Sequence, residues 1–408
     1  MPGLRPEPRA LVVQARAALA GGDRPRALAI LSRAAELFPD LSPLQVEFGN
    51  ISLIQGDVAA AEAAYRRAIA TDPKDAAAHV GLGNALRDKD EPEQAIAVYR
   101  RAAELAPGLA AIWHNLGLVL REVGRYQDAV AAYDRALATE PDRSATWYNK
   151  ANALTAGGRY ADAVAAYEEA LRLKPDYPEA IFSQSMALLL AGDFARGWDL
   201  YEARWRARTF ASPYRFARLP RWQGESLSGK HLLVWGEQGI GDEIRFLSIL
   251  GEILGQARAV SYVGEQRLNR LLARAFPSLL LPEMAGGDRD PASTGIDLQT
   301  PVGSLARFRR RSLEAFPEPR PFLAPDAALR QGWSRWLRTL GPGAKIGISW
   351  RTGRNARRKQ ARYAPLDAWG RFLDQVPACW ICLQYDDCDD DIAAFARRFG
   401  AVVHVPPG

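Results

Sequence analysis

The stretch AAIWHNLGLVLREVGRYQDAVAAYDRALATEPDR, residues 110–143, decides the fold of the first half of this chain. Trp113, Leu116 and Leu120 recur at spacings of three and four, the pattern of a buried apolar stripe on an α-helix. Gly124 ends that helix, and a second helical pattern continues until Pro141 stops it. The stretch therefore predicts a pair of helices joined by a short turn.

The same unit recurs along the chain with a strict period. Proline returns every 34 residues, at Pro39, Pro73, Pro107, Pro141 and Pro175. A fixed period of this length is typical of arrays in which each helix pair packs only on its neighbours. We expect an α-solenoid over residues 8–208, with repeats that begin at Pro8, Ser42, Ala76, Ala110 and Ser144 and a modified sixth repeat from Pro178.

Small and large residues return at fixed positions within each unit, as in Gly83 with Tyr99 and Ala151 with Tyr167. This spacing resembles the tetratricopeptide repeat. The resemblance implies a superhelix whose concave groove binds extended peptides or partner proteins.

Asparagines recur on the first helix of the repeats. Asn50, Asn84 and Asn152 share one position, and Asn115 and Asn149 stand three residues earlier in their repeats. Residues three apart share a helix face, so these side chains could form an amide ladder that binds a peptide backbone in the groove. The alternative is that asparagine is merely common at these positions and solvated, and the sequence leaves both open.

The composition excludes several classes of protein. The chain has 408 residues, 48% of them hydrophobic and 25% charged, with a net charge of +6. These values are ordinary for globular domains and unlike those of disordered, collagen-like or disulfide-rich proteins. No apolar run is long enough to span a bilayer, and Gln14 and Arg16 interrupt the N-terminal apolar stretch, so we expect a cytoplasmic protein without a membrane span.

All the cysteines lie close together, at Cys379, Cys382 and Cys388. They could supply part of a zinc site, for which His404 is the nearest histidine. The surrounding segment has the composition of a buried strand, however, so we expect buried thiols and no metal.

The pattern changes after the repeats. A connector rich in aromatic residues, 209–229, leads to an apolar run at 231–235 that has the composition of a buried parallel strand. A glycine-rich turn, a helix over 244–254, strands at 259–263 and 278–281 and a helix over 266–276 are expected next. This alternation predicts a Rossmann-like α/β domain over residues 230–340. A second such unit over 341–408, with strands at 345–350, 378–385 and 401–405 and helices at 366–375 and 390–399, is too short for a complete doubly wound sheet.

The turn GEQGIGD, residues 236–242, is a candidate ligand-binding turn. It lacks the Gly-Lys-Ser/Thr of a P-loop and the glycine spacing of the dinucleotide fingerprint. Around Gly239 and Gly241 it still places free backbone amides at a helix N-terminus. Asp242 is either a helix cap or a catalytic base, and its spacing alone favours the cap.

Residues 341–366 contain basic side chains and no acidic ones: Lys345, Arg351, Arg354, Arg357, Arg358, Lys359 and Arg362. Most of them follow a predicted strand, where open α/β sheets bind ligands, and arginine suits bidentate phosphate contacts. We expect a phosphate-bearing ligand here; the alternatives are a solvated basic loop and a non-specific nucleic-acid patch. A second basic run, residues 307–311, is expected at the surface.

Four segments together resemble a bacterial family that joins tetratricopeptide repeats to a GT-B glycosyltransferase domain, related to heptosyltransferases and more distantly to O-GlcNAc transferase. They are WGEQGIGDEI (235–244), PVGSL (301–305), GISWR (347–351) and CLQY (382–385). The resemblance implies two Rossmann-like domains across a cleft, a nucleotide-sugar donor held mainly by the second domain, and no metal or other cofactor. Members continue beyond the equivalent of Gly408, so we expect a truncated second domain.

The resemblance also assigns roles to single residues. Asp242 matches the proposed general base, which would deprotonate an acceptor hydroxyl. Arg362 falls where a lysine touches the donor phosphate, and Arg351 would stabilise the leaving diphosphate. Gly239, Gly241, Arg358 and Lys359 complete the candidate donor or phosphate site.

Two functions are therefore expected from the sequence. The first is a glycosyltransferase that moves a sugar from a nucleotide-sugar to a protein or glycan acceptor presented by the repeats, with no nucleic-acid partner. The alternative is a non-catalytic peptide- or protein-binding scaffold with a degenerate transferase-like domain.

Overall fold

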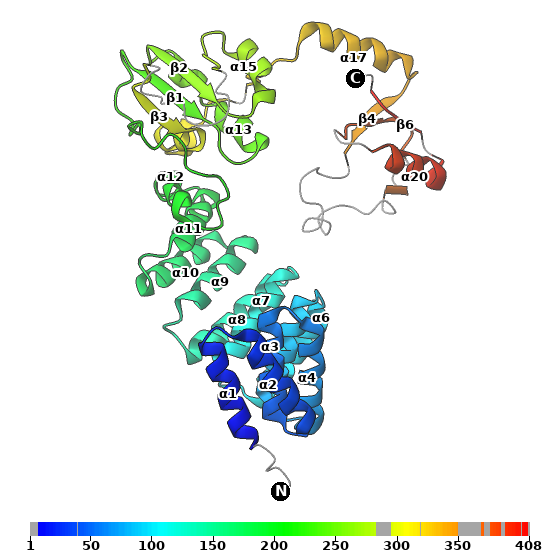
Figure 1. The fold of residues 1–408 in the computed structure, drawn as a ribbon. Coiled ribbons are helices and arrows are strands. Elements are labelled where there is room, and N and C mark those ends of the chain that lie inside the picture. Colours follow the sequence, from blue (N-terminus) through cyan, green and yellow to red (C-terminus); the bar gives the residue numbers. More distant parts are fainter. Residues whose placement is uncertain are drawn as a thin grey trace. The chain divides into compact units, whose positions relative to one another are not determined.

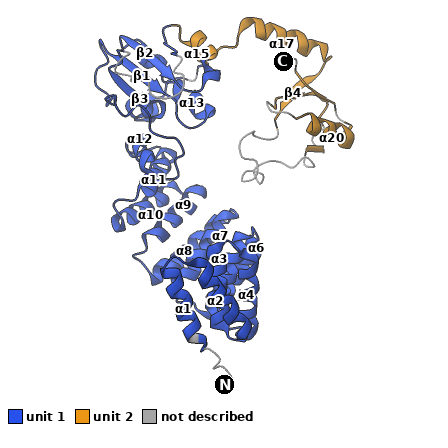
Figure 2. Ribbon diagram, viewed as in Figure 1, with its two compact units in different colours: residues 1–269, 278–320 blue, residues 270–277, 321–408 orange. Residues whose placement is uncertain are grey.

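The computed structural model describes residues 7–38, 40–282, 295–318, 320–349, 369–370, 376–384, 388–400 and 402–406. The chain divides into two compact units, residues 1–269 with 278–320, and residues 270–277 with 321–408 (Figure 2).

Consecutive helix pairs form the first part of the first unit (Figure 1). The first helix of each pair begins at the residue where the 34-residue period places it, which confirms the predicted repeat starts. The helices are α1 (Pro8–Ala20), α2 (Arg24–Leu37), α3 (Ser42–Gln55), α4 (Val58–Thr71), α5 (Ala76–Asp88), α6 (Pro92–Leu105), α7 (Ala110–Glu122), α8 (Tyr126–Thr139), α9 (Ser144–Ala156), α10 (Tyr160–Leu173), α11 (Pro178–Ala191) and α12 (Phe194–Tyr201).

Buried tyrosines explain the alternation of small and large residues. Tyr65, Tyr99 and Tyr133 are fully buried. Each ring lies on a glycine of its own repeat, because a Cβ atom at Gly49, Gly83 or Gly117 would come within 2.7, 2.7 or 2.6 Å of the ring. A larger side chain at any of these glycines would push the paired helices apart.

The Tyr65 ring is covered on a second side by Gly81 of the next repeat, where a Cβ atom would overlap the ring. We expect Gly81→Ala to destabilise the repeats by about 1–3 kcal/mol, because the buried ring cannot move away. Gly108→Ala is the matched control, since a Cβ atom there meets nothing within 4 Å. Urea unfolding followed by circular dichroism measures both, and an unchanged midpoint for Gly81→Ala would contradict the packing argument.

The carbonyl oxygens of the recurring prolines bind ring nitrogens at one fixed position of the following repeat. The indole Nε1 groups of Trp113 and Trp147 each donate to the carbonyl oxygen of the preceding period-marking proline, Pro107 or Pro141, at 2.8 Å. His79 Nε2 lies 3.1 Å from the Pro73 carbonyl in the same arrangement. These bonds tie each repeat to the turn that precedes it.

A three-stranded parallel sheet follows the repeats within the first unit. Its order is β2 (Ala259–Val263), β1 (His231–Trp235) and β3 (Leu298–Pro301), with β1 in the centre. The first two strands are confirmed as predicted. The strand expected at 278–281 is wrong, because Leu280 forms only an isolated bridge to Ser261. The third strand is β3, whose short sequence LQTP carries too little apolar pattern to indicate a strand.

Helices join these strands. α13 (Ile240–Leu247) and α14 (Gly251–Leu254) connect β1 to β2, and α16 (Leu305–Arg309) follows β3. The predicted helix over 244–254 is therefore two helices, and it starts four residues earlier than expected. The Trp235 side chain at the end of β1 is fully buried, so this end of the sheet is closed by packing.

The second unit holds another three-stranded parallel sheet, in the order β4 (Ala344–Ile348), β5 (Ala378–Cys382) and β6 (Val403–His404). Its helices are α17 (Ala327–Thr339), which the sequence did not predict, and α20 (Asp389–Phe399), which it did; α15 (Asn269–Ala275) links the units in sequence. Most of the helix expected over 366–375 lies outside the described residues. Two small parallel sheets are thus present in the second half of the chain.

Candidate functional site

The first sheet has a switch point at the carboxyl end of its central strand. The chain passes from β1 to β2 on one side and then crosses to β3 on the other. Open α/β sheets bind ligands in the crevice that such a reversal creates. In this sheet that position lies between the turn at residues 236–242 after β1 and Val302–Ser304 after β3, and we call it the switch-point crevice.

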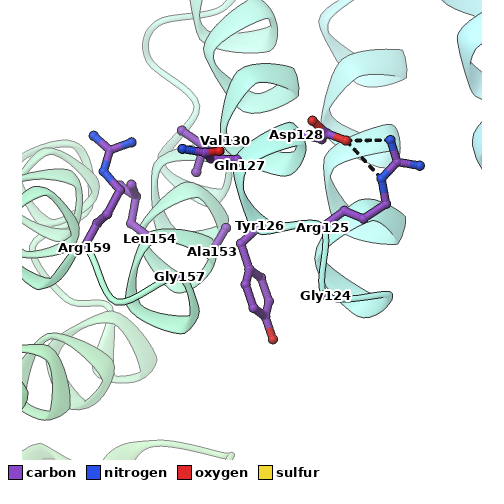
Figure 3. Close-up of a pocket in the computed structure, with 10 residues that line it drawn as sticks. All are labelled: Gly124, Arg125, Tyr126, Gln127, Asp128, Val130, Ala153, Leu154, Gly157 and Arg159. Carbon is purple, nitrogen blue, oxygen red and sulfur yellow. Dashed lines mark hydrogen bonds and ion pairs between the residues drawn. The ribbon is translucent and has the colours of Figure 1, made fainter.

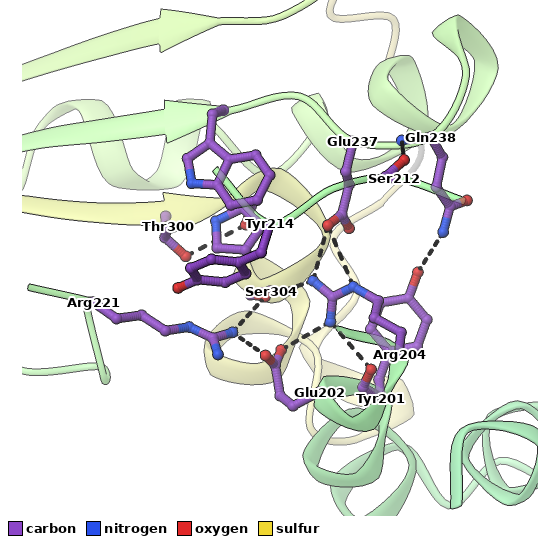
Figure 4. Close-up of polar contacts among 12 residues, drawn as sticks. Tyr201, Glu202, Arg204, Ser212, Tyr214, Arg221, Glu237, Gln238, Thr300 and Ser304 are labelled. Carbon is purple, nitrogen blue, oxygen red and sulfur yellow. Dashed lines mark hydrogen bonds and ion pairs between the residues drawn. The ribbon is translucent and has the colours of Figure 1, made fainter. Parts of the chain in front are cut away.

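A side chain from the last repeat lies at this position, between Glu237 and Ser304 (Figure 4). Arg204 follows α12 in a short 3-10 helix, Glu202–Arg206, and is fully buried. Its Nη2 atom donates to Glu237 Oε2 at 3.0 Å and to Ser304 Oγ at 2.8 Å. The guanidinium also lies over the rings of Tyr201 and Trp205, at 4.3 and 4.4 Å from their centroids. Arg204 therefore occupies the place where such sheets take a ligand.

The partners of Arg204 form a charge network that is largely closed to water. Glu202 accepts from Arg204 Nη1 at 3.2 Å and also pairs with Arg221, which donates to Ser304 Oγ at 3.0 Å. Burial raises the pKa of Glu237, and Arg204 opposes that shift only in part. The network joins the repeats to both loops of the crevice, and its charges depend on each other because few of them can reach water.

The last repeat and the connector that follows it also hold the turn at residues 236–242. Gln238 adopts a left-handed backbone with φ of 65°. Its N–H donates to Ser212 Oγ at 2.7 Å, and its side-chain amide donates to the Tyr201 hydroxyl at 3.2 Å (Figure 4). Strained conformations of this kind persist only where the surroundings hold them.

Asp242 lies in the first turn of α13. The helix begins at Ile240, so the cap position belongs to Gly239 and the interpretation of Asp242 as the cap is wrong. A carboxylate in the first turn still complements the helix dipole. Its side chain is 36% exposed, and its carboxylate lies 4.0 Å from Arg245. Gly239 offers no side-chain acceptor, and its carbonyl oxygen accepts from the amides of Asp242 and Glu243 at 2.9 and 3.0 Å. The amides of Ile240 and Gly241 are therefore the ones in the first turn of α13 that could bind an anionic group.

The basic residues of the predicted donor site lie outside the described residues. Arg351, Arg354, Arg357, Arg358, Lys359 and Arg362 all belong to that part of the chain. Lys345 lies on β4, and its ammonium donates to the carbonyls of Gly341 and Gly343. The phosphate-binding role of the basic stretch stays a prediction.

Three of the five candidate groove asparagines form hydrogen bonds with buried tyrosines. Asn50, Asn84 and Asn152 each accept a hydrogen bond from the buried tyrosine of the same repeat, at 2.8, 2.5 and 2.6 Å. Asn115 donates to Asn84 at 3.3 Å, which is one rung of an amide ladder, whereas Asn149 donates to a carbonyl of its own helix. The oxygens of the first three are thus used inside the repeats, and peptide binding by these residues stays a prediction.

His114 lies at the interface between helices. Its Nδ1 lies 2.9 Å from Thr146 Oγ1, and its ring packs edge-on against Tyr133. Burial, together with the charges of Arg143 and Arg87, lowers the pKa of His114 to about 4. The imidazole is therefore neutral at physiological pH and acts as a packing residue.

Three hollows lie next to α8, within and beside the repeat at residues 110–143. One of about 480 Å³ lies at the start of α8, where Arg125 pairs with Asp128 beside Gly157 and Arg159 (Figure 3). The second and third lie on either side of α8 and include Trp113 and Trp147 respectively. Trp113 was expected in a buried stripe; it is half-buried instead and lines the second hollow.

The second basic run lies at the surface in part, because Arg311 is exposed and Arg307 is partly exposed. Arg310 is buried and forms an ion pair with Glu252. Arg307 and Arg311 both bind Asp199 of α12, at 2.9 Å, and these contacts lower the pKa of Asp199. The expected surface position is therefore confirmed for Arg311 and wrong for Arg310. The acids that bind the run, Glu252 and Asp199, are distant from it in sequence, so the sequence pattern did not indicate these ion pairs.

The three cysteine thiols do not share one set of partners. Cys382 and Cys388 have their sulfur atoms 3.5 Å apart, whereas Cys379 donates to the Leu340 carbonyl. Among the described residues, no three side chains of the metal-binding types gather around one point.

Comparison with known proteins agrees with the repeat geometry. The family model of the tetratricopeptide repeat matches residues 46–110, 114–178 and 148–208, and a second model of the same repeat matches residues 8–33. The first half of the chain is an array of tetratricopeptide repeats. No helix in the described part of the chain combines the length and apolarity needed to cross a bilayer.

One relative of this chain is a bacterial protein. Protein FlbA of Caulobacter vibrioides is 31% identical over 232 residues, which cover 52% of this chain and 38% of FlbA. The chain thus spans well under half the length of that relative.

Three solved protein structures are similar to part of this chain. MamA is 21% identical, covering 41% of this chain and 92% of its own, with a TM-score of 0.38. YrrB, described as a TPR protein with an unusual peptide-binding site, is 19% identical, with coverages of 44% and 89% and a TM-score of 0.37. TTC0263 of Thermus thermophilus is 24% identical, with coverages of 45% and 100% and a TM-score of 0.37.

Proposed function

We propose that this protein is a tetratricopeptide-coupled glycosyltransferase. The repeats bind a protein acceptor, and the α/β half moves a sugar from a nucleotide-sugar to a hydroxyl of that acceptor. One observation carries the proposal: Asp242 stands half-exposed in the first turn of α13, beside the carboxyl end of the central strand β1. Parallel sheets place their chemistry at that edge. The proposal includes a cytoplasmic location, as the sequence predicts.

In this reaction Asp242 would act as the general base. Its carboxylate takes the proton of the acceptor hydroxyl while the oxygen attacks the anomeric carbon and the nucleoside diphosphate leaves. Arg351, Arg358, Lys359 and Arg362 would stabilise the leaving diphosphate. The open amides around Gly239 and Gly241 support an anionic group near the base.

A second candidate is a non-catalytic protein-binding scaffold, and a specific observation favours it. Arg204 lies in the switch-point crevice of the first sheet, so this sheet has its ligand position occupied by its own chain. The hollows around α8 lie on the repeats and not on the sheet.

Thermal unfolding in the presence of UDP- and GDP-sugars separates the two candidates. A transferase is stabilised by its donor, by about 2.7 kcal/mol at a hundred times the dissociation constant. We expect the melting temperature to rise with one nucleotide class and not with the other. If no donor in the panel shifts the melting temperature, the transferase proposal fails for this chain and the scaffold remains.

A further inference from the structure

The two hollows beside α8 are copies of each other, one repeat apart. We name them the first valley, lined by Trp113, Leu120 and Ala132, and the second valley, lined by Trp147, Leu154 and Ala166. Each residue of the first set is 34 positions before its counterpart in the second. Their volumes are about 480 and 370 Å³. A ligand group that fits one valley would therefore also fit the other.

Both tryptophans are held in place before any ligand arrives. Their indole N–H groups are bound to the carbonyls of Pro107 and Pro141, and both rings are half-buried. A rigid aromatic surface loses little entropy when it binds, which is why aromatic grooves recur in peptide recognition. Lys150 already lies over the Trp147 ring, 4.9 Å from its centroid, so the second ring has a cation on it.

The charges at the rims differ between the valleys. In the first valley, Glu104 is paired with Arg101 and Asp128 with Arg125, at 2.7 and 2.5 Å. Arg100 and Arg135 also line this valley, and neither forms an ion pair with a described residue.

The corresponding positions in the second valley are acidic. Asp134 binds Lys150 at 2.6 Å, and Glu169 binds Arg172 at 2.9 Å. The second valley thus has its charges matched within the protein, whereas the first has two arginines that a ligand carboxylate would satisfy.

The spacing of the valleys selects the form of the ligand. Successive repeats are one helix-packing distance apart, about 10 Å. Three residues of polyproline II conformation span about 9 Å. An extended segment with apolar side chains three positions apart would place one side chain in each valley.

We propose that the two valleys bind one extended, proline-rich segment of a partner protein, with an acidic residue over the first valley and apolar side chains three residues apart. This deepens the protein-binding part of the proposed function and does not depend on sugar transfer. Its test uses no nucleotide-sugar, so its outcome is independent of the donor experiment.

The probe is the fluorescein-labelled peptide GDLPPLPSG, titrated with the full chain and followed by fluorescence anisotropy. Two companion peptides are GKLPPLPSG, with the charge reversed, and GDSPPSPSG, without the apolar side chains. We expect the first peptide to bind about tenfold more tightly than either companion, since hot-spot aromatic and arginine contacts typically contribute at least this much.

Arg135→Glu tests the charge assignment without disturbing the core, because Arg135 is exposed. It should abolish the preference for GDLPPLPSG over GKLPPLPSG, because the introduced carboxylate offsets the remaining charge of Arg100. Arg67→Glu is the matched control, since it makes the same charge change on an exposed position of α4, away from both valleys. Trp147→Ala should weaken the first peptide about tenfold, with the helical circular dichroism retained.

Several outcomes would overturn the proposal. One is equal affinity, or no binding, for all three peptides. Another is an unchanged peptide preference in Arg135→Glu. A third is self-association of the chain that Arg135→Glu abolishes while no peptide binds, since the occupant would then be a second copy.

Discussion

Arg204→Ala is expected to destabilise the first unit by about 3–5 kcal/mol, because it leaves the buried carboxylate of Glu237 without its partner. Trp205 lies 4.4 Å from the guanidinium and its ring is 5.3 Å from that of Trp235, so these two of the chain's 11 tryptophans lie next to the substitution and contribute to the fluorescence signal. Thermal unfolding followed by that signal should show an earlier transition for the variant.

The effect should also depend on pH. Without Arg204, the folded-state pKa of Glu237 rises further above its unfolded value of about 4.3. A carboxyl group with a raised folded-state pKa contributes its full stability below the unfolded pKa, and that stability is lost as pH rises through the folded-state pKa. The deficit of Arg204→Ala against the natural protein should therefore be smallest near pH 4 and largest at neutral pH.

Two further variants give this prediction its control. Arg206 lies on the same short helix but is 59% exposed, so Arg206→Ala should change stability by no more than about 1 kcal/mol. Replacing both charges, Arg204→Met with Glu237→Leu, should recover part of the loss. If Arg204→Ala is as stable as Arg206→Ala, the charge network around Arg204 does not stabilise the contact between the repeats and the sheet.

Asp242→Asn is expected to reduce sugar transfer by a factor of about 10²–10⁴, the usual contribution of a positioned general base. The amide keeps the shape of the side chain but cannot accept the acceptor's proton. Release of nucleoside diphosphate, from whichever donor raises the melting temperature, measures the rate. Donor stabilisation itself should persist, because the proposed phosphate contacts lie elsewhere in the chain.

Asp142→Asn makes the same chemical change on an exposed turn of the repeats and should leave transfer unchanged. An Asp242→Asn variant with full activity would remove Asp242 from the mechanism. The role of the α/β half as a transferase would then need another base.

The repeat half could be predicted closely from the sequence. Its helices begin at Ser42, Ala76, Ala110 and Ser144, where the proline period places them. The reason is that the stabilising contacts are short in sequence. Tyr99 binds Asn84 only 15 residues away, and Trp113 binds Pro107 only six residues away. A regular sequence pattern therefore records these contacts directly.

The α/β half was predicted in part. β1 and β2 are apolar runs and were found, whereas β3 is short and polar and was not. The start of α13 was placed four residues too late, which made Asp242 appear to be a cap. Both errors have one cause: a short strand or a glycine-rich helix start is decided by what packs on it and carries little local signal.

The sequence by itself determined the repeat period, the tetratricopeptide architecture and the position of the turn that carries Asp242. Only the tertiary structure showed that Arg204 lies in the switch-point crevice, that Asp199 binds the second basic run and that Trp113 and Trp147 line twin valleys. Arg204 is 33 residues from Glu237 and 100 from Ser304, and Asp199 is 108 from Arg307. Contacts of that range follow no period, because they depend on how whole elements pack and not on the spacing of residues within one.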